Sequence, residues 1–255
     1  MKTNTDTKKW IWTDEYLISS YDVDAGGKAP LTTLGRLMQE TAYNHAEHLG
    51  FGYHQLKENN FFWVLSRLLI RVNRYPHWGE RVVLRTWPTG IERLFAYRDY
   101  RLLDEQGVTL AEAGSAWLIL DADKHRPQRP DELRARIDIL PDKPALNERP
   151  AKIPALTHPV KGESFPVRYS DLDLYDHVNN AKYIEWILDS YPVTMLREKG
   201  LREFEINFLS ETKMGERVAI HTQKTDDAHY LHCIRREGDD KEICMARTLW
   251  ASENS

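Results

Sequence analysis

One short stretch of the sequence concentrates side chains that can do chemistry. Between Tyr169 and Tyr183 the chain carries three carboxylates, one histidine and two asparagines, directly ahead of a strongly apolar segment. Imidazole and carboxylate groups are common partners in proton transfer near neutral pH. The competing interpretation is a helix cap, with Asn179 or Asn180 as the N-cap and the acids favoured by the helix dipole.

The sequence also consists of two related halves. Three pairs of segments match in the same order: Trp78–Thr86 with Met214–Thr222, Ala113–Trp117 with Ala246–Trp250, and Tyr21–Asp24 with Ser170–Asp173. Such spacing indicates the duplication of a whole domain rather than of a short repeat unit.

The duplication allows one half to be compared with the other. Asp24 and Lys28 correspond to Asp173 and His177, so the first half keeps the acid and lacks the histidine. Leu31 likewise corresponds to Asn180. The first half is expected to fold in the same way without these polar groups. The polar cluster of the second half therefore indicates a functional role rather than a requirement of folding.

Each half has the same order of predicted elements: a short strand, one long helix and several strands. The apolar spacing predicts helices over residues 33–49 and 180–196, with Pro192 kinking or ending the second. The predicted strands are Phe62–Val72, Arg81–Trp87, Leu94–Leu103, Thr109–Leu120, Phe204–Leu209, Arg217–Lys224, Tyr230–Arg236 and Ile243–Ala251. This order predicts an α+β fold in which an antiparallel sheet wraps each long helix and the two sheets join edge to edge.

The positions of the prolines indicate the domain limits, and the composition excludes several classes of protein. Seven of the twelve prolines lie between Pro127 and Pro159, which predicts a linker over residues 126–162 between domains at 10–125 and 163–252. A net charge of −4 excludes a global basic field for nucleic acid. With no signal-like or membrane-spanning segment, we expect a cytoplasmic protein without membrane insertion.

The second-half string Ser170–Ser190 resembles a motif of acyl-acyl-carrier-protein (acyl-ACP) thioesterases, tandem "hotdog" domain enzymes of bacteria and plastids. Four first-half segments resemble the same family: Gln39–Ala46, Trp63–Arg67, Arg74–Gly79 and Ser115–Leu118. The resemblance covers nearly the whole chain and implies hydrolysis of fatty acyl-ACP, releasing free fatty acid. An acyl-CoA thioesterase is the alternative enzyme, and a non-catalytic acyl-binding module is the alternative from another class.

The resemblance also implies which residues act. It places Asp173 and His177 in the catalytic network and Glu211 as the catalytic acid residue. Tyr175 and Thr212 are possible supporting residues: the family often has asparagine at the first of these positions, and plant members have cysteine at the second. A cysteine nucleophile is therefore excluded at that position. We expect Glu211 to activate water, oriented through His177, and a direct attack by a carboxylate is the competing mechanism.

The remaining expectations concern binding. Backbone N–H groups near residues 178–180, with Asn179 and Asn180 as supporting side chains, are candidates for polarising the thioester carbonyl. The resemblance implies no cofactor and no metal, and a partner in acyl carrier protein with its 4'-phosphopantetheine-linked acyl chain. Lys182 or Lys213 is a candidate for docking that acidic partner, and a homodimer stays open. The candidate walls of an acyl-chain pocket, for which core packing is the alternative, are Leu37, Met38, His45, Trp63 and Leu65.

Overall fold

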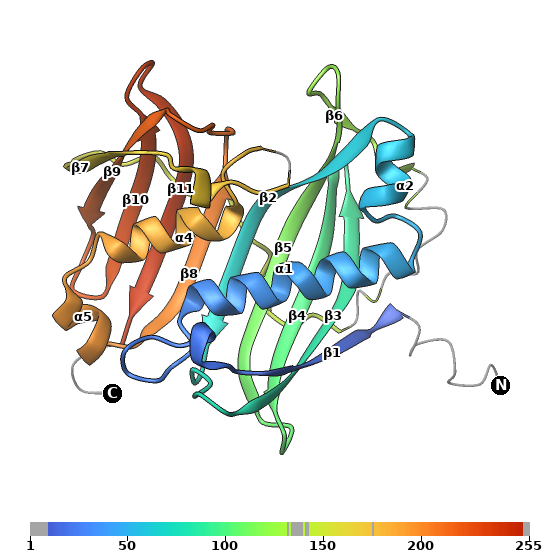
Figure 1. Ribbon diagram of the computed structural model, residues 1–255, viewed down its shortest axis with the longest axis horizontal. Helices are drawn as coiled ribbons and strands as arrows, with labels where there is room; N and C mark the ends of the chain where they lie inside the picture. The colour runs from blue at the N-terminus through green and yellow to red at the C-terminus, as the bar shows by residue number, and fades with distance from the viewer. Residues whose placement is uncertain (1–9, 132, 134–139, 141–142, 175, 252–255) are drawn as a thin grey trace. The chain divides into compact units, whose positions relative to one another are not determined.

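The computed structural model describes residues 10–131, 133, 140, 143–174 and 176–251 (Figure 1). The chain divides into two compact units. Unit 1 comprises Met1–Leu68 and Asn73–Pro150, and unit 2 comprises Leu69–Val72 and Ala151–Ser255.

Unit 1 packs one long helix on one face of an antiparallel sheet, and Figure 1 shows α1 lying across the strands. Its strands follow the order β1-β3-β4-β5-β2 in the sheet, with β6 beside β5. The strands are β1 (Trp12–Leu17), β2 (Phe61–Val72, ending in unit 2), β3 (Arg81–Glu92), β4 (Phe95–Asp104), β5 (Thr109–Asp121) and β6 (Pro127–Gln128). The helices are η2 (Ser20–Asp22), α1 (Leu31–His48) and α2 (Tyr53–Glu58).

The sequence of α1 explains its length and its buried face. Leu31, Leu34, Met38 and His45 recur at helical spacing, and all four are buried. The helix ends where the chain turns at Gly50, whose φ of 75° lies in the left-handed region that glycine adopts without a steric penalty.

Unit 2 has the same plan with a shorter helix. Its sheet order is β8-β11-β10-β9-β7, and α4 covers one face. The strands are β7 (Val160–Pro166), β8 (Leu201–Phe208), β9 (Arg217–Lys224), β10 (His229–Arg236) and β11 (Lys241–Trp250). The helices are η3 (Tyr169–Asp171), α4 (Asn180–Asp189) and α5 (Val193–Glu198).

The α+β prediction is confirmed, and two predicted elements need correction. The helix predicted to reach residue 196 ends instead at Asp189, and Pro192 is the N-cap of a separate helix, α5. Proline lacks the N–H that would continue the helix, and its ring clashes with the preceding turn. Strand β3 continues past its predicted end at Trp87, because a register shift after Pro88 accommodates the missing donor. No helix among the described residues is long and apolar enough to cross a membrane.

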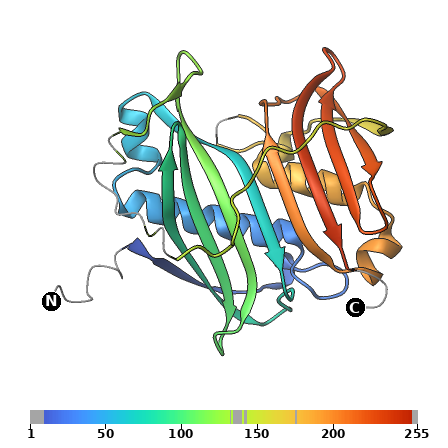
Figure 2. The ribbon, with the colours of Figure 1, turned by 180° about the vertical axis from the view of Figure 1, so that it is seen from behind.

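In each unit, the described part of the linker lies on the sheet face away from the long helix, as the view from behind shows (Figure 2). In unit 1, the Ala145 N–H donates to Asp99 Oδ2 (2.7 Å), and Trp87 Nε1 donates to the Lys143 carbonyl oxygen (2.9 Å). Proline-rich backbone cannot pair as a strand, so its remaining amides need side-chain acceptors. In unit 1, Asp99 provides such an acceptor, and Trp87 instead donates to a linker carbonyl.

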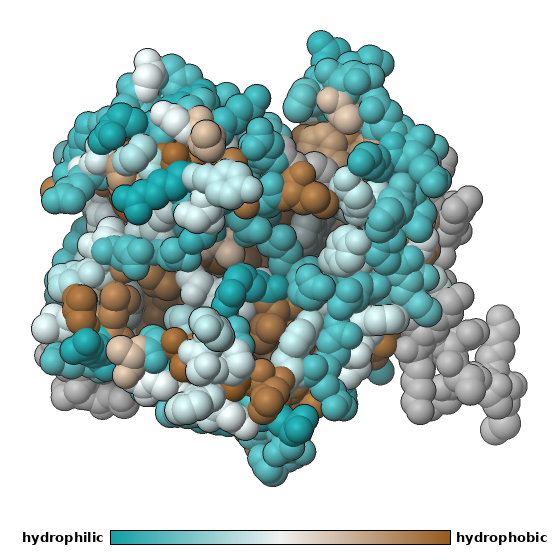
Figure 3. All heavy atoms as spheres, in the orientation of Figure 1, coloured by the Kyte–Doolittle hydropathy of each residue, from teal (hydrophilic) through white to brown (hydrophobic). Residues whose placement is uncertain are grey.

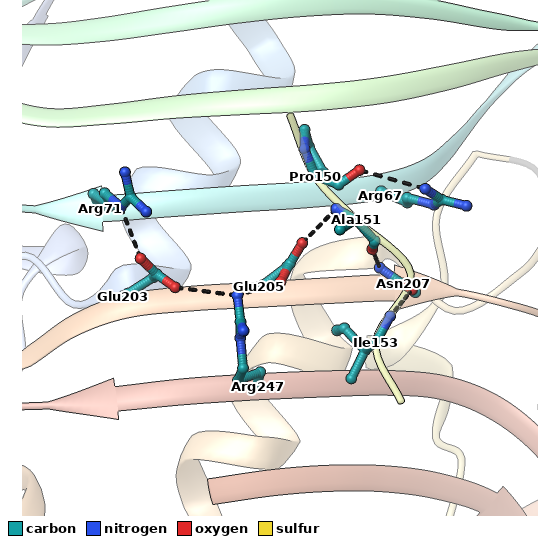
Figure 4. A network of polar contacts seen from close by, with 9 residues as sticks. All are labelled: Arg67, Arg71, Pro150, Ala151, Ile153, Glu203, Glu205, Asn207 and Arg247. Atoms are coloured by element: carbon teal, nitrogen blue, oxygen red, sulfur yellow. Dashed lines mark hydrogen bonds and ion pairs between the residues drawn. The ribbon is translucent and has the colours of Figure 1, made fainter. Parts of the chain in front are cut away.

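In unit 2 the linker is fixed to β8 in the same way (Figure 4). The Ala151 N–H donates to Glu205 Oε1 (2.6 Å) and the Ile153 N–H to Asn207 Oδ1 (2.9 Å), while Asn207 Nδ2 donates to the Ala151 carbonyl oxygen (2.9 Å). Arg247 pairs with the other oxygen of Glu205 at 2.9 Å, so this buried carboxylate is hydrogen-bonded and charge-paired.

The buried His232 makes the folding stability of unit 2 depend on pH. Its Nδ1 lies 3.1 Å from Thr222 Oγ1 and its Nε2 lies 2.7 Å from Tyr191 Oη, and burial lowers the pKa of His232 to about 3. Below the ordinary histidine pKa of about 6.5, the unfolded chain binds a proton that the folded chain excludes. Stability is therefore fully present above about pH 6.5 and falls as the pH drops toward 3.

We expect this one histidine to cost about 2 kcal/mol of unfolding free energy between pH 6.5 and pH 5. Urea unfolding of the wild type and of His232→Asn at pH 7 and pH 5 measures the effect. The variant should lose less stability than the wild type over that interval. Equal losses in the two proteins would show that His232 does not set this dependence.

Candidate active site

Two loops of unit 2 form the candidate site. The first, residues 167–179, joins β7 to α4, and the second, residues 209–216, joins β8 to β9. Three backbone hydrogen bonds connect the loops: Val167 N–H to the Glu216 carbonyl (2.8 Å), Gly215 N–H to the Val167 carbonyl (3.2 Å), and Val178 N–H to the Thr212 carbonyl (3.1 Å). The loops are thus joined at both ends of the site.

The connected loops bring His177 and Glu211 together. His177 Nε2 lies 3.3 Å from Glu211 Oε2, and the two side chains are 22% and 35% exposed. The pair is therefore close enough for proton exchange or a charge-assisted contact, and water can reach it. The two residues are 34 positions apart in the sequence, so only the fold makes them neighbours.

Asp173 begins the tight turn that presents His177. The Asp173 N–H donates to the His177 carbonyl oxygen (2.8 Å), and the Asp176 N–H donates to the Asp173 carbonyl oxygen (3.1 Å). Asp176 has φ of 61°, a left-handed conformation that aspartate tolerates better than most residues. Tyr175, between them, lies outside the described residues.

The start of α4 resolves the helix-cap question. Asn179 is the N-cap, since its side chain accepts the Ala181 N–H at 2.9 Å. The Val178 and Asn179 N–H groups, expected to polarise a substrate carbonyl, instead donate to the carbonyl oxygens of Thr212 and Asp171. That expectation is wrong for these two N–H groups, because each already donates to a backbone carbonyl within the two loops.

Thr212 is buried, unlike Glu211, which directly precedes it. Its side chain is fully buried, next to the buried phenol of Tyr183. Burial raises the pKa of Tyr183, and the Thr212 hydroxyl opposes that rise. Thr212 therefore lies inside the unit, whereas Glu211 faces water.

Unit 1 has the same set of backbone hydrogen bonds between and within its two matching loops, which we call the loop frame. The matching hydrogen bonds run from Ile18 N–H to the Glu80 carbonyl (2.9 Å), Gly79 N–H to the Ile18 carbonyl (2.8 Å), Ala29 N–H to the Pro76 carbonyl (2.8 Å), Asp24 N–H to the Lys28 carbonyl (2.8 Å) and Gly27 N–H to the Asp24 carbonyl (2.9 Å). Gly27 also takes the left-handed conformation, with φ of 72°.

This frame assigns each site residue its counterpart. Lys28 occupies the place of His177, and Tyr75, directly before Pro76, occupies the place of Glu211. The same backbone therefore forms without the histidine–glutamate pair. The acid Asp24 is kept, and its Oδ1 accepts the Gly26 and Lys28 N–H groups. An aspartate at this position thus has a role in the turn itself.

The residues expected to line an acyl-chain pocket all lie in or near the interior of unit 1. Met38, His45 and Leu65 are buried, and Leu37 and Trp63 are partly buried. Trp63 Nε1 donates to the Phe51 carbonyl oxygen (2.7 Å) and packs on a hydrophobic cluster. These contacts are those of core packing, and a role as pocket wall stays a prediction.

One polar contact in unit 1 was not foreseen from the sequence. Arg98 Nη1 donates to His45 Nδ1 at 2.8 Å and to Thr86 Oγ1 at 3.2 Å. The alternation of side chains along β4 is the one sequence signal that could have predicted Arg98 on the helix-facing side of the sheet. An arginine is unusual at such a position.

The two lysines expected to attract an acidic partner differ in their surroundings. Lys182 Nζ lies 2.9 Å from Glu185 Oε1 and 3.8 Å from Asp171 Oδ1, so its charge is balanced locally. Lys213 is exposed. Within the described residues, no group of three or more His, Cys, Asp or Glu side chains could hold a metal ion.

Comparisons with known proteins identify the family. Residues 9–137 match the family model for the acyl-ACP thioesterase N-terminal domain, and residues 157–252 match that for the C-terminal domain. Oleoyl-acyl carrier protein thioesterase 1 of Arabidopsis thaliana chloroplasts is 28% identical over 95% of this chain and 76% of its own length. A palmitoyl-acyl carrier protein thioesterase of Gossypium hirsutum is 30% identical over 96% of this chain and 65% of its own length.

Solved structures show the same fold. An acyl-ACP thioesterase from Bacteroides thetaiotaomicron superposes with a TM-score of 0.87 at 27% identity, covering 96% of this chain and 99% of that chain. The 12:0-ACP thioesterase of Umbellularia californica superposes with a TM-score of 0.82 at 23% identity, covering 95% of this chain and 97% of that chain. The prediction of two tandem hotdog domains is confirmed. The chain belongs to the acyl-ACP thioesterase family and is a thioester hydrolase.

Proposed function

We propose that this chain hydrolyses the thioester of a fatty acyl chain on acyl carrier protein, and that His177 and Glu211 do the chemistry. The observation that carries the proposal is the 3.3 Å contact between these two side chains, which water can reach. Unit 1 forms the same backbone hydrogen bonds without such a pair. Relatives named oleoyl- and palmitoyl-ACP thioesterases support this substrate class over acyl-CoA.

A thioester carbonyl is already electrophilic, so the reaction needs chiefly an activated water. Glu211 accepts a proton from that water as its oxygen attacks the carbonyl carbon. His177, in contact with Glu211, orients the carboxylate and the water. As the tetrahedral intermediate collapses, the carbon–sulfur bond breaks, and the proton passes to the departing phosphopantetheine sulfur. Free fatty acid and the carrier thiol are the products.

Two further residues support this pair. Asn180, which corresponds to Leu31 in unit 1, is a candidate amide donor to the developing oxyanion, since the Val178 and Asn179 N–H groups already have acceptors. Asp173 is a candidate positioning residue by analogy with Asp24, whose side chain accepts the Gly26 and Lys28 N–H groups in the matching turn of unit 1.

The first test removes each member of the pair. We expect His177→Ala and Glu211→Gln each to lower kcat on acyl-ACP by about 100-fold or more, the usual contribution of general acid–base catalysis. Steady-state kinetics on purified variants measures this. Lys28→Ala, at the matching place in unit 1, is the control and should stay within about twofold of wild type. Near-normal turnover by either site variant would remove the pair from the mechanism.

A second test separates the turn-forming role of Asp173 from a role of its charge. Asparagine can accept the same backbone hydrogen bonds as aspartate, and alanine cannot. We therefore expect Asp173→Asn to retain kcat within about tenfold, and Asp173→Ala to lose about 100-fold. If both variants lose activity equally, the negative charge of Asp173 takes part in the chemistry.

A third test addresses direct attack by Glu211, which would pass through an anhydride. A single turnover in H2(18)O distinguishes the two routes. With Glu211 as a general base, the label appears in the fatty acid and the protein stays unlabelled. Label recovered first in the carboxylate of Glu211, by mass spectrometry of the digested protein, would exclude the general-base route.

A further inference from the structure

Arg98 places a guanidinium group in the interior of unit 1, between α1 and the sheet. Its Nη1 donates to His45 Nδ1 (2.8 Å) and to Thr86 Oγ1 (3.2 Å), and both partners are fully buried. Because His45 accepts this hydrogen bond at Nδ1, its imidazole is neutral. Hydrophilic side chains dominate the outer surface of unit 1 in the view of Figure 3, and Arg98 departs from that pattern.

The charge of Arg98 has no counter-ion. Among the described residues, no carboxylate pairs with this guanidinium, and its Nε and Nη2 have no hydrogen-bond partner. Burial lowers the pKa of Arg98, yet the side chain keeps part of its surface accessible. By contrast, Arg101 on the opposite face of β4 donates to Glu112 Oε1 at 2.9 Å. A desolvated charge without a partner is costly, so Arg98 calls for a reason other than folding.

Unit 2 fills the matching position without a charge. Arg98 pairs with Ser115 across β4 and β5, as Tyr230 pairs with Thr248 across β10 and β11. Ser115 and Thr248 lie at matching positions of the repeated segments Ala113–Trp117 and Ala246–Trp250. Tyr230 is therefore the counterpart of Arg98, and the duplicated fold does not require a cation there.

The polar groups inside unit 2 are also paired with one another. Both ring nitrogens of His232 have partners, in Thr222 Oγ1 (3.1 Å) and Tyr191 Oη (2.7 Å), and Tyr191 Oη lies 2.6 Å from Thr248 Oγ1. This internal network is complete without a ligand. The interior of unit 1 differs, because Arg98 still has donors to offer.

Apolar side chains lie beside the guanidinium. Ala96, two residues before Arg98, lies on the same face of β4 and belongs to a buried cluster with Trp10 and Phe51, against which Trp63 packs. The open N–H groups match the two oxygens of a carboxylate, which arginine binds in a fork. The neighbouring apolar cluster matches an aliphatic chain. A ligand that carries both groups fits these surroundings.

We propose that Arg98 binds a carboxylate at the end of an aliphatic chain, between α1 and the sheet of unit 1. Its Nε and Nη2 donate to the two carboxylate oxygens, and the negative charge balances the guanidinium. Two sources have this chemistry: a free fatty acid, and an acyl chain with a second carboxylate at its far end. The choice of these ligands rests on the proposed function, in which a fatty acid is the product.

The first experiment titrates free fatty acids, from octanoate to palmitate, into the protein by isothermal titration calorimetry. We expect Arg98→Met to raise the Kd of the acid that binds wild type best by about tenfold or more. The alcohol of the same chain length should bind both proteins equally. Arg101→Met is the matched control on the same strand and should keep the wild-type Kd. The urea midpoint of Arg98→Met should equal or exceed that of wild type, because the substitution removes an uncompensated charge.

The second experiment tests the other source of the carboxylate. It compares kcat/KM for an ω-carboxyacyl-ACP with that for the plain acyl-ACP of the same length. If the substrate supplies the carboxylate, the ratio of the two values should fall about tenfold or more in Arg98→Met, and Arg101→Met should leave it unchanged.

The outcomes separate this inference from the proposed function. A rise in the fatty acid Kd identifies the product as the ligand, and a fall in the kcat/KM ratio identifies the substrate. An Arg98→Met variant that matches wild type in both measurements, or that has a clearly lower urea midpoint, would overturn the carboxylate site alone. A wild-type protein without activity on acyl-ACP would overturn the proposed function, and the fatty acid titration would still test Arg98.

Discussion

One backbone hydrogen bond sets the distance on which the proposed chemistry depends. The Val178 N–H donates to the Thr212 carbonyl oxygen, and these two residues directly follow His177 and Glu211. That 3.1 Å bond brings the backbones of His177 and Glu211 close together, and their side chains approach to 3.3 Å. Preorganisation of this kind spares the active site the cost of ordering its groups during reaction.

The same bond in unit 1, from Ala29 N–H to the Pro76 carbonyl, holds no catalytic pair. The two units therefore separate what the backbone requires from what the reaction requires, within one molecule. Side chains that differ between otherwise superimposable hydrogen-bond patterns are the informative ones. By this criterion His177, Glu211 and Asn180 stand apart, whereas Asp173 and Asp24 share a turn.

Much of the fold could be predicted because its signals are local. Alternating strands, the helical spacing of α1 and the matching segments of the two halves all lie within short windows of sequence. The end of α4 at Asp189 was harder, because Pro192 permits either a kink or a break and tertiary packing decides between them. The length of β3 depended on a register shift at Pro88 that no window reveals.

The candidate site residues can be named from the sequence, whereas their geometry cannot. His177 was evident from its neighbours, and Glu211 followed only from family resemblance, since nothing near it in sequence marks it. The use of the Val178 N–H by Thr212 joins residues far apart in the chain, so it could not be foreseen.

The linker has a consequence for how unit 2 comes apart. The amides of Ala151 and Ile153 are bonded to side chains that rise from β8, not to a neighbouring strand. Detaching this segment would break its hydrogen bonds to Glu205 and Asn207 and let water reach both side chains, although Arg247 would still pair with Glu205. The linker from Ala151 onward is therefore held to unit 2 by specific hydrogen bonds and is not a free hinge.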